Sequence, residues 1–195
     1  MAIYLAIPII DELVRHVEDD PESNNAVQAM VAAVLNYYYS PQNGYGVSFG
    51  QHRNDTRVDA IITRIQSDFP GDRRVVDHMY VNASRSSDPI YTSLGELGDS
   101  LRGLSSEVQQ CWAIVVQGRA FKIYSYQKEP EGDYRLVPWF PPTVLLRNPF
   151  DVRDDAAVID WMLRHIAKAE ISTARRRVKA GPVVDNGEVV RMRVK

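Results

Sequence analysis

The sequence predicts an α/β domain in which a mixed central sheet is flanked by helices. Its 195 residues and 45% hydrophobic content are sufficient for one buried core. Apolar residues recur at helical spacing in two segments near the N-terminus, in a central segment and in a segment near the C-terminus. Between them lie three consecutive strand-like segments and a separate strand pair. Three sequential strands, a crossover helix and a further pair describe a mixed sheet with helices packed on it.

The N-terminal half is expected to form two helices followed by three strands. Residues 9–17 place apolar side chains at helical spacing, and the pattern stops before Pro21. The second helix begins at Ser23 or Asn24, since either residue suits an N-cap. Its apolar residues cover most of its circumference, so it should be largely buried. The three strands are expected at residues 45–50, 56–66 and 74–84.

The C-terminal half is expected to contain a crossover helix, a hairpin and a long helix. Leucines at helical spacing predict the crossover helix over residues 90–104. The clearest strand pair is a hairpin over residues 111–127, around a Gln-Gly turn. An amphipathic helix is expected over residues 152–177. Residues 183–194 add a terminal strand across an Asp-Asn-Gly turn.

These elements indicate a single domain over residues 1–178, with its core at about 24–127. Residues 179–195 are expected to be a basic C-terminal tail or an edge strand. Residues 128–143 are expected to form a loop rich in aromatic residues and proline. Its aromatic side chains either offer a surface to a partner or cover the core.

Charge is distributed unevenly along the chain. The net charge is −2, but residues 164–195 hold nine Lys or Arg against three Asp or Glu. The rest of the chain holds 14 basic and 22 acidic side chains, so an acidic body carries a basic C-terminal segment. This segment can contact phosphates or an acidic partner, or it is a solvated helix end. The candidate contact residues are Arg175, Arg176, Arg177 and Lys179.

Several classes of protein are not indicated by the sequence. The only cysteine, Cys111, excludes an internal disulfide framework and is typical of a reducing compartment. The apolar N-terminus lacks a basic region before it, and no apolar run approaches the length needed to span a membrane. We therefore expect an intracellular protein, cytoplasmic or nuclear, that has no membrane partner. Neither a glycine-rich phosphate loop nor a Gly-x-Ser-x-Gly elbow is present.

A row of polar residues in the third strand is the first candidate site. In "HMYVNASR", alternation predicts that one face of the strand carries the side chains of His78, Tyr80, Asn82 and Ser84. In the preceding strand, Asp59 has apolar neighbours on both sides. A carboxylate in that position is unusual unless it is paired or functional.

This pattern resembles the PD-(D/E)XK nuclease-like superfamily, also called restriction-endonuclease-like. The resemblance rests on the element order and on the hairpin "WAIVVQGRAFKIYSY", and it covers about residues 24–127. It implies a restriction-endonuclease-like core with extra N- and C-terminal helices. In that family, an Asp on one strand and Glu-x-Lys on the next bind magnesium and orient the attacking water. Asp59 matches the Asp, while Asn82 and Ser84 stand where the Glu and the Lys would be.

The departures from the family motif weaken the expected chemistry. An Asn carbonyl is a weaker magnesium ligand than a carboxylate, and a serine hydroxyl cannot supply the charge of the lysine. Additional candidates are His78, Tyr80 and Arg85, although alternation directs Arg85 to the opposite face. Asp77 would need a bulge to approach Asn82. A helix-borne carboxylate is the other source, from Glu12, Glu22 or Glu96.

Three functions follow from these observations. The first is a catalytically inactive nuclease-fold protein that binds a protein partner, slightly favoured over nucleic acid, with no cofactor expected. Tyrosines at 37–39, 45, 124 and 126 would contribute a contact surface, and a homo-oligomer is compatible with it. The second is a nuclease dependent on Mg²⁺ or Mn²⁺ and centred on Asp59. The third is a structural α/β interaction domain of other ancestry, in which Asp59 pairs with Arg57 or Arg64.

Overall fold

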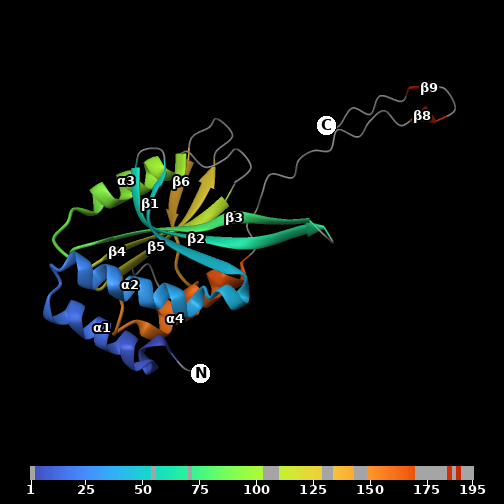
Figure 1. Ribbon diagram of the computed structural model, residues 1–195. Helices are drawn as coiled ribbons and strands as arrows, with labels where there is room; N and C mark the ends of the chain where they lie inside the picture. The colour runs from blue at the N-terminus through green and yellow to red at the C-terminus, as the bar shows by residue number, and fades with distance from the viewer. Residues whose placement is uncertain are drawn as a thin grey trace.

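A mixed seven-stranded sheet with helices on both faces forms the centre of the protein, so the predicted α/β class is confirmed (Figure 1). The structure is a computed structural model. It describes residues 3–53, 56–69, 72–102, 110–128, 134–142, 149–169, 184–185 and 188–189.

The helices and strands follow the predicted order through the first two thirds of the chain. The α-helices are α1 (Pro8–Asp19), α2 (Asn24–Tyr38), α3 (Ile90–Arg102) and α4 (Ala156–Lys168). Short 3₁₀ helices are η1 (Tyr4–Ala6) and η2 (Pro41–Asn43). The strands of the main sheet are β1 (Tyr45–Arg53), β2 (Thr56–Phe69), β3 (Asp72–Ser84), β4 (Gln110–Gln117), β5 (Ala120–Lys128), β6 (Tyr134–Pro138) and β7 (Phe150–Asp151). A separate pair consists of β8 (Val184–Asp185) and β9 (Glu188–Val189).

The connections of the sheet make it mixed rather than purely antiparallel. The first three strands pair in series as an antiparallel meander, and α3 then returns the chain so that β4 lies parallel to β3. An antiparallel hairpin joins β4 to β5, and both β6 and β7 pair with β5. A parallel pair needs such a crossover connection.

Two apolar layers hold the helices on the sheet. The larger layer packs α1, α2 and α4 against one face, and the smaller packs α3 against the other (Figure 1). In β3, Met79 and Val81 belong to the larger layer and Tyr80 to the smaller, as strand alternation requires. The predicted N-cap is also observed, since Ser23 Oγ accepts a hydrogen bond from the Ala26 amide at 3.3 Å. Among the described residues, no helix has the length and apolar character needed to cross a membrane.

Two segments differ from the sequence prediction. The expected loop over residues 128–143 contains the strand β6, which is formed by pairing with β5. The last helix begins at Ala156 rather than 152 and ends at Lys168, where the backbone of Ala169 becomes extended. The rest of the predicted helix, residues 170–177, lies outside the described residues. In the earlier segment, residues 128–143, Trp139 is partly buried against the larger layer, which supports a core-covering role for that segment.

The tyrosines expected on a contact surface are mostly internal, so that prediction is wrong. Tyr38, Tyr39, Tyr45, Tyr124 and Tyr126 are all buried. Their rings belong to the two apolar layers. Several hydroxyls have partners there, as buried hydroxyls require. Tyr38 donates to Asp160 Oδ1 at 2.6 Å, for example.

Side chains from the sheet and α2 bind the C-terminal carbonyls of α4. Four donors contribute: Tyr39 to Leu163 at 3.3 Å, His78 to Ile166 at 3.0 Å, Tyr45 to Ala167, and Arg64 to Ala169 at 2.7 Å. The last carbonyls of a helix have no partner within the helix. These four side chains therefore hold the last turns of α4 against the sheet.

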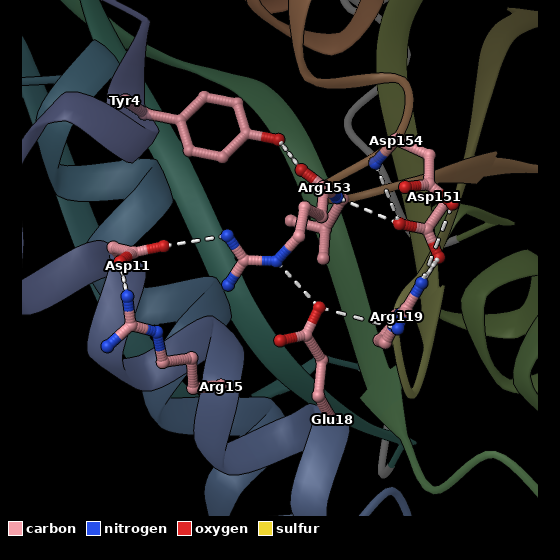
Figure 2. A network of polar contacts seen from close by, with 9 residues as sticks. Tyr4, Asp11, Arg15, Glu18, Arg119, Asp151, Arg153 and Asp154 are labelled. Atoms are coloured by element: carbon pink, nitrogen blue, oxygen red, sulfur yellow. Dashed lines mark hydrogen bonds and ion pairs between the residues drawn. The ribbon is translucent and has the colours of Figure 1, made fainter.

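An ionic network joins α1 to the turn that precedes α4 (Figure 2). Arg153 contacts Asp11 at 2.8 Å and Glu18 at 2.7 Å, both on α1. Arg119, in the turn between β4 and β5, contacts Glu18 at 3.4 Å and Asp151 at 2.6 Å. The hydrogen bonds to Glu18 and Asp11 raise the pKa of Arg153, and the hydrogen bond from Arg153 lowers the pKa of Asp11. The network therefore fastens the outer helix to the end of the sheet.

Candidate functional site

A β-bulge at His78 interrupts the polar row predicted for β3. Ile62 of β2 pairs with Met79, but the next residue, Thr63, pairs with Asp77, so His78 is the extra residue. Its ring is fully buried on the α4 side, where Nε2 donates to the Ile166 carbonyl at 3.0 Å. The prediction that His78 shares a face with Asn82 is therefore wrong.

The same bulge brings Asp77 to the face that carries Tyr80. The Tyr80 hydroxyl donates to Asp77 Oδ2 at 2.7 Å. Asp77 can reach this face only through a bulge, as expected from the sequence, and the structure contains that bulge. Because Tyr80 is fully buried, its hydroxyl serves to hold Asp77 at the layer of α3.

Asp59 lies where the ladder between β1 and β2 is interrupted. Pairing runs through Phe49 and Ala60, resumes at Gln51 and Val58, and omits Gly50 and Asp59. Strand alternation also breaks here, because Val58 and Ile61 both belong to the α3 layer. Gly50 has a φ of 60°, a left-handed conformation that glycine adopts without strain.

The carboxylate of Asp59 accepts hydrogen bonds from two neutral groups of the protein. The Ala83 amide donates to Oδ2 at 2.7 Å, and Gln28 on α2 donates through Nε2 to Oδ1 at 3.1 Å. Arg57 Nε lies 3.8 Å from Oδ1, and its side chain is 63% exposed. The ion pair expected under the third function therefore exists with Arg57, whereas Arg64 binds the end of α4.

Burial raises the pKa of Asp59, against the opposing effects of the Ala83 amide and the charge of Arg57. The negative charge of Glu96 adds to the increase. A carboxylate with a raised pKa is one whose charge its surroundings do not fully compensate. Burial is the largest of these causes, so the surroundings of Asp59 disfavour its charged form even though Arg57 is nearby.

Asn82 faces the opposite layer, toward α3. Its amide Nδ2 donates to Glu96 Oε2 at 2.9 Å and to the Ser93 carbonyl at 3.4 Å. Ser84 follows on the same face, and its hydroxyl lies 3.4 Å from the Ser93 hydroxyl. Of the three helix-borne glutamates considered from the sequence, Glu96 is therefore the one that approaches Asn82.

The site residues predicted from the resemblance are brought to neighbouring positions but not to one cluster. Asp59 contacts α2 and the backbone amide of Ala83, while Asn82 and Ser84 contact α3. Arg85 lies beyond the end of β3, where its guanidinium Nη2 pairs with Asp88 Oδ1 at 2.9 Å. Within the described ranges, no group of three or more His, Cys, Asp or Glu side chains is placed to hold a metal ion.

Two contributors were not anticipated from the sequence. Gln28 is a single amide on the helix α2, and no spacing rule relates it to Asp59, 31 positions later. Ser93 likewise follows from the packing of α3 rather than from a motif. The basic candidates Arg175, Arg176, Arg177 and Lys179 lie outside the described residues.

A pocket of about 300 Å³ opens beside Asp59, between α2 and the strands β1 and β2. Its walls are mainly apolar, and Asp59 and Arg57 provide its charged groups. This hollow is the part of the candidate site that a ligand can enter. Comparison of the chain with protein-family models, with curated proteins and with solved structures gives no match, so the geometry of these residues carries the functional argument.

Proposed function

We propose that this chain is a degenerate relative of the PD-(D/E)XK nuclease-like superfamily that binds a protein partner instead of cleaving nucleic acid. The order of elements supports the first half of the proposal. A helix, an antiparallel three-strand meander, a crossover helix and a strand parallel to the third occur in the order on which the resemblance rests. The restriction-endonuclease-like core, about residues 24–127, would then consist of α2 to β5.

One observation carries the second half of the proposal. The Asp59 carboxylate and the Asn82 amide are both engaged by protein groups, and they point to different layers of the fold. Magnesium takes several oxygen ligands in near-octahedral geometry. Bringing these two groups, which lie on neighbouring strands and point to different layers, to one metal ion would require breaking the bonds to Ala83 and Glu96. The arrangement favours a site that has kept its shape and lost its metal chemistry.

The charge of the chain favours a protein over a nucleic acid as the partner. Outside residues 164–195, acidic side chains outnumber basic ones by 22 to 14. Such a body repels the phosphates that dominate the affinity of proteins for nucleic acids. A partner with basic or neutral contact residues meets no such repulsion.

The active nuclease remains the second candidate because of Glu96. This carboxylate lies 2.9 Å from the Asn82 amide, and its charge is felt at Asp59. A rearrangement that turned Asp59 toward α3 would bring two carboxylates together, as metal-dependent hydrolysis requires. Mg²⁺ or Mn²⁺ would then be the cofactor.

Cleavage assays separate the two candidates. The full chain and its Asp59→Ala variant are incubated with labelled single-stranded and duplex DNA and RNA, in Mg²⁺ or in Mn²⁺. We expect both proteins to leave the substrates at the level of the protein-free control. Cleavage by the wild type that Asp59→Ala abolishes would establish the nuclease and refute the binding-only proposal. Asp99→Ala, on an exposed position of α3, is a matched control for loss of a carboxylate.

A further inference from the structure

The pocket beside Asp59, which we call the slot, is lined mainly by apolar residues of α2, β1 and β2. One wall is the helix α2, which contributes Ala29, Ala32 and the stem of Gln28. The other comes from β1, where Phe49 is 43% exposed. A volume of about 300 Å³ can accommodate a long aliphatic side chain with a terminal group. The volume and the apolar lining therefore suit a ligand of that size with an apolar stem.

Asp59, in the lining of the slot, determines which charge the terminal group should carry. The Asp59 side chain is 15% exposed, and its two hydrogen-bond donors are neutral. The α2 wall has no charged residue from Asn24 to Tyr38. Arg57 lies 3.8 Å away and extends into solvent, so it compensates the carboxylate only in part. A cation entering the slot would gain a charge-assisted hydrogen bond to Asp59 and a face of Phe49.

The edge strand β1 contributes Phe49 and Gly50 to the lining of the slot. In the described part of the sheet, β1 pairs with β2 on one side and has no strand on the other. An extended peptide can add to such an edge through main-chain hydrogen bonds, while its alternate side chains enter adjacent pockets. Gly50 is exposed in the middle of this edge, and a Cβ placed there would meet nothing within 4 Å. The peptide backbone can thus approach β1 closely beside the slot.

We propose that the slot receives a lysine or arginine side chain from a segment of a partner protein that pairs in extended conformation with β1. The aliphatic stem would lie between the alanines of α2 and Phe49, and the cationic head would meet Asp59. This inference rests on the proposed function, whose binding role it makes specific. The partner is thus an extended basic segment, whose cationic side chain adds to the partial compensation that Arg57 gives Asp59.

Peptide binding measured by fluorescence anisotropy tests the proposal on the full chain. The probe is a labelled, end-capped peptide with a central lysine flanked by alternating valine and threonine. Its matched partner has norleucine in place of lysine, which keeps the stem and removes the charge. We expect the lysine peptide to bind at least about tenfold more tightly than the norleucine peptide. Asp59→Asn should abolish that difference, because the amide retains an acceptor for Ala83 but carries no charge.

A second variant tests the location without changing charge. Ala29→Trp, at an exposed position of α2, should fill the slot and weaken the lysine peptide at least about tenfold. Ala157→Trp, at an exposed position of α4 outside the slot, is its matched control and should bind as the wild type does.

Each remaining outcome overturns the inference. Equal affinities for the two peptides, absence of binding by either, or retention of affinity in Ala29→Trp would each exclude a cationic side chain in the slot. A peptide bound only after Arg175, Arg176 and Arg177 are replaced by alanine would identify the chain's own tail as the occupant and would refute a separate partner. None of these results bears on cleavage, so the nuclease assay judges the proposed function independently.

Discussion

Replacing His78 with glutamine should remove about 3 kcal/mol of the stability loss that acid causes between about pH 7 and about pH 4. The His78 ring is fully buried, and its Nε2 donates to the Ile166 carbonyl. Its Nδ1 has no hydrogen-bond partner among the described residues. Burial and the nearby charge of Arg64 lower the pKa of His78 to about 4. Protonation of the folded protein would place an unpaired charge in the core.

The size of the effect follows from the difference between the two states. In the unfolded chain the pKa of a histidine is 6.5. Between that value and about 4, the unfolded state binds a proton that the folded state refuses. The free energy of unfolding therefore decreases as the pH falls, by about 1.4 kcal/mol per pH unit and about 3 kcal/mol in all. Below the folded pKa both states are protonated, and this loss is complete.

Urea unfolding at a series of pH values measures the effect, with tryptophan fluorescence as the signal. Glutamine can donate to the Ile166 carbonyl but does not titrate. The stability of His78→Gln should therefore fall about 3 kcal/mol less than that of the wild type across this range. His16→Gln, at an exposed position of α1, controls for the substitution itself. Parallel stability profiles for wild type and His78→Gln would refute the assignment of a buried neutral imidazole.

Three further results are expected. Arg153→Met should lower the free energy of unfolding by about 1–2 kcal/mol in urea titrations, because Asp11 and Glu18 each lose one of their two guanidinium partners. Arg15→Met, on the exposed face of α1, should cost under about 0.5 kcal/mol. Equal effects of the two substitutions would contradict the network in Figure 2. Gly118→Ala should destabilise by about 1 kcal/mol or more, since its φ is 55° and an added Cβ would lie 3.1 Å from Ser86, and a neutral result would show that the turn can relax. Cys111 should resist a maleimide in the folded protein and react fully in urea, because burial raises the pKa of its thiol, and rapid labelling of the native state would contradict that burial.

Sequence patterns predicted those elements of the fold that neighbouring residues along the chain determine. Ser23 caps α2 as its side chain type suggests, and the Gln-Gly turn closes the hairpin of β4 and β5. Which side chains of β2 and β3 share a face was harder to predict, because the rule of alternation holds only where strand pairing is uninterrupted. The bulge at His78 depends on a carbonyl of α4 that lies 88 positions later, and the break at Asp59 depends on an amide of α2. No pattern within either strand reports those contacts.

The candidate site was predicted in part for the same reason. Asp59 is a mid-strand carboxylate with partners, and Glu96 is a helix-borne acid near Asn82; both expectations come from residue type and element order. The division of these residues between two layers comes from the three-dimensional path of β2 and β3. The strand β6 was missed because its short sequence ends in proline, and only pairing with β5 makes it a strand.

The bulge at His78 also divides one continuous strand into two units of different stability. Beyond it, β2 and β3 continue as a two-stranded ribbon that carries the exposed side chains of Ile65 and Val75, and β1 pairs no further than Arg64 (Figure 1). A ribbon of two strands has little stability of its own. Amide hydrogens before His78 should therefore exchange through local opening, while those of Met79 to Val81, which pair with β2 and β4, should exchange only through global unfolding. The amide hydrogen-exchange rate along β3 should therefore change abruptly at His78.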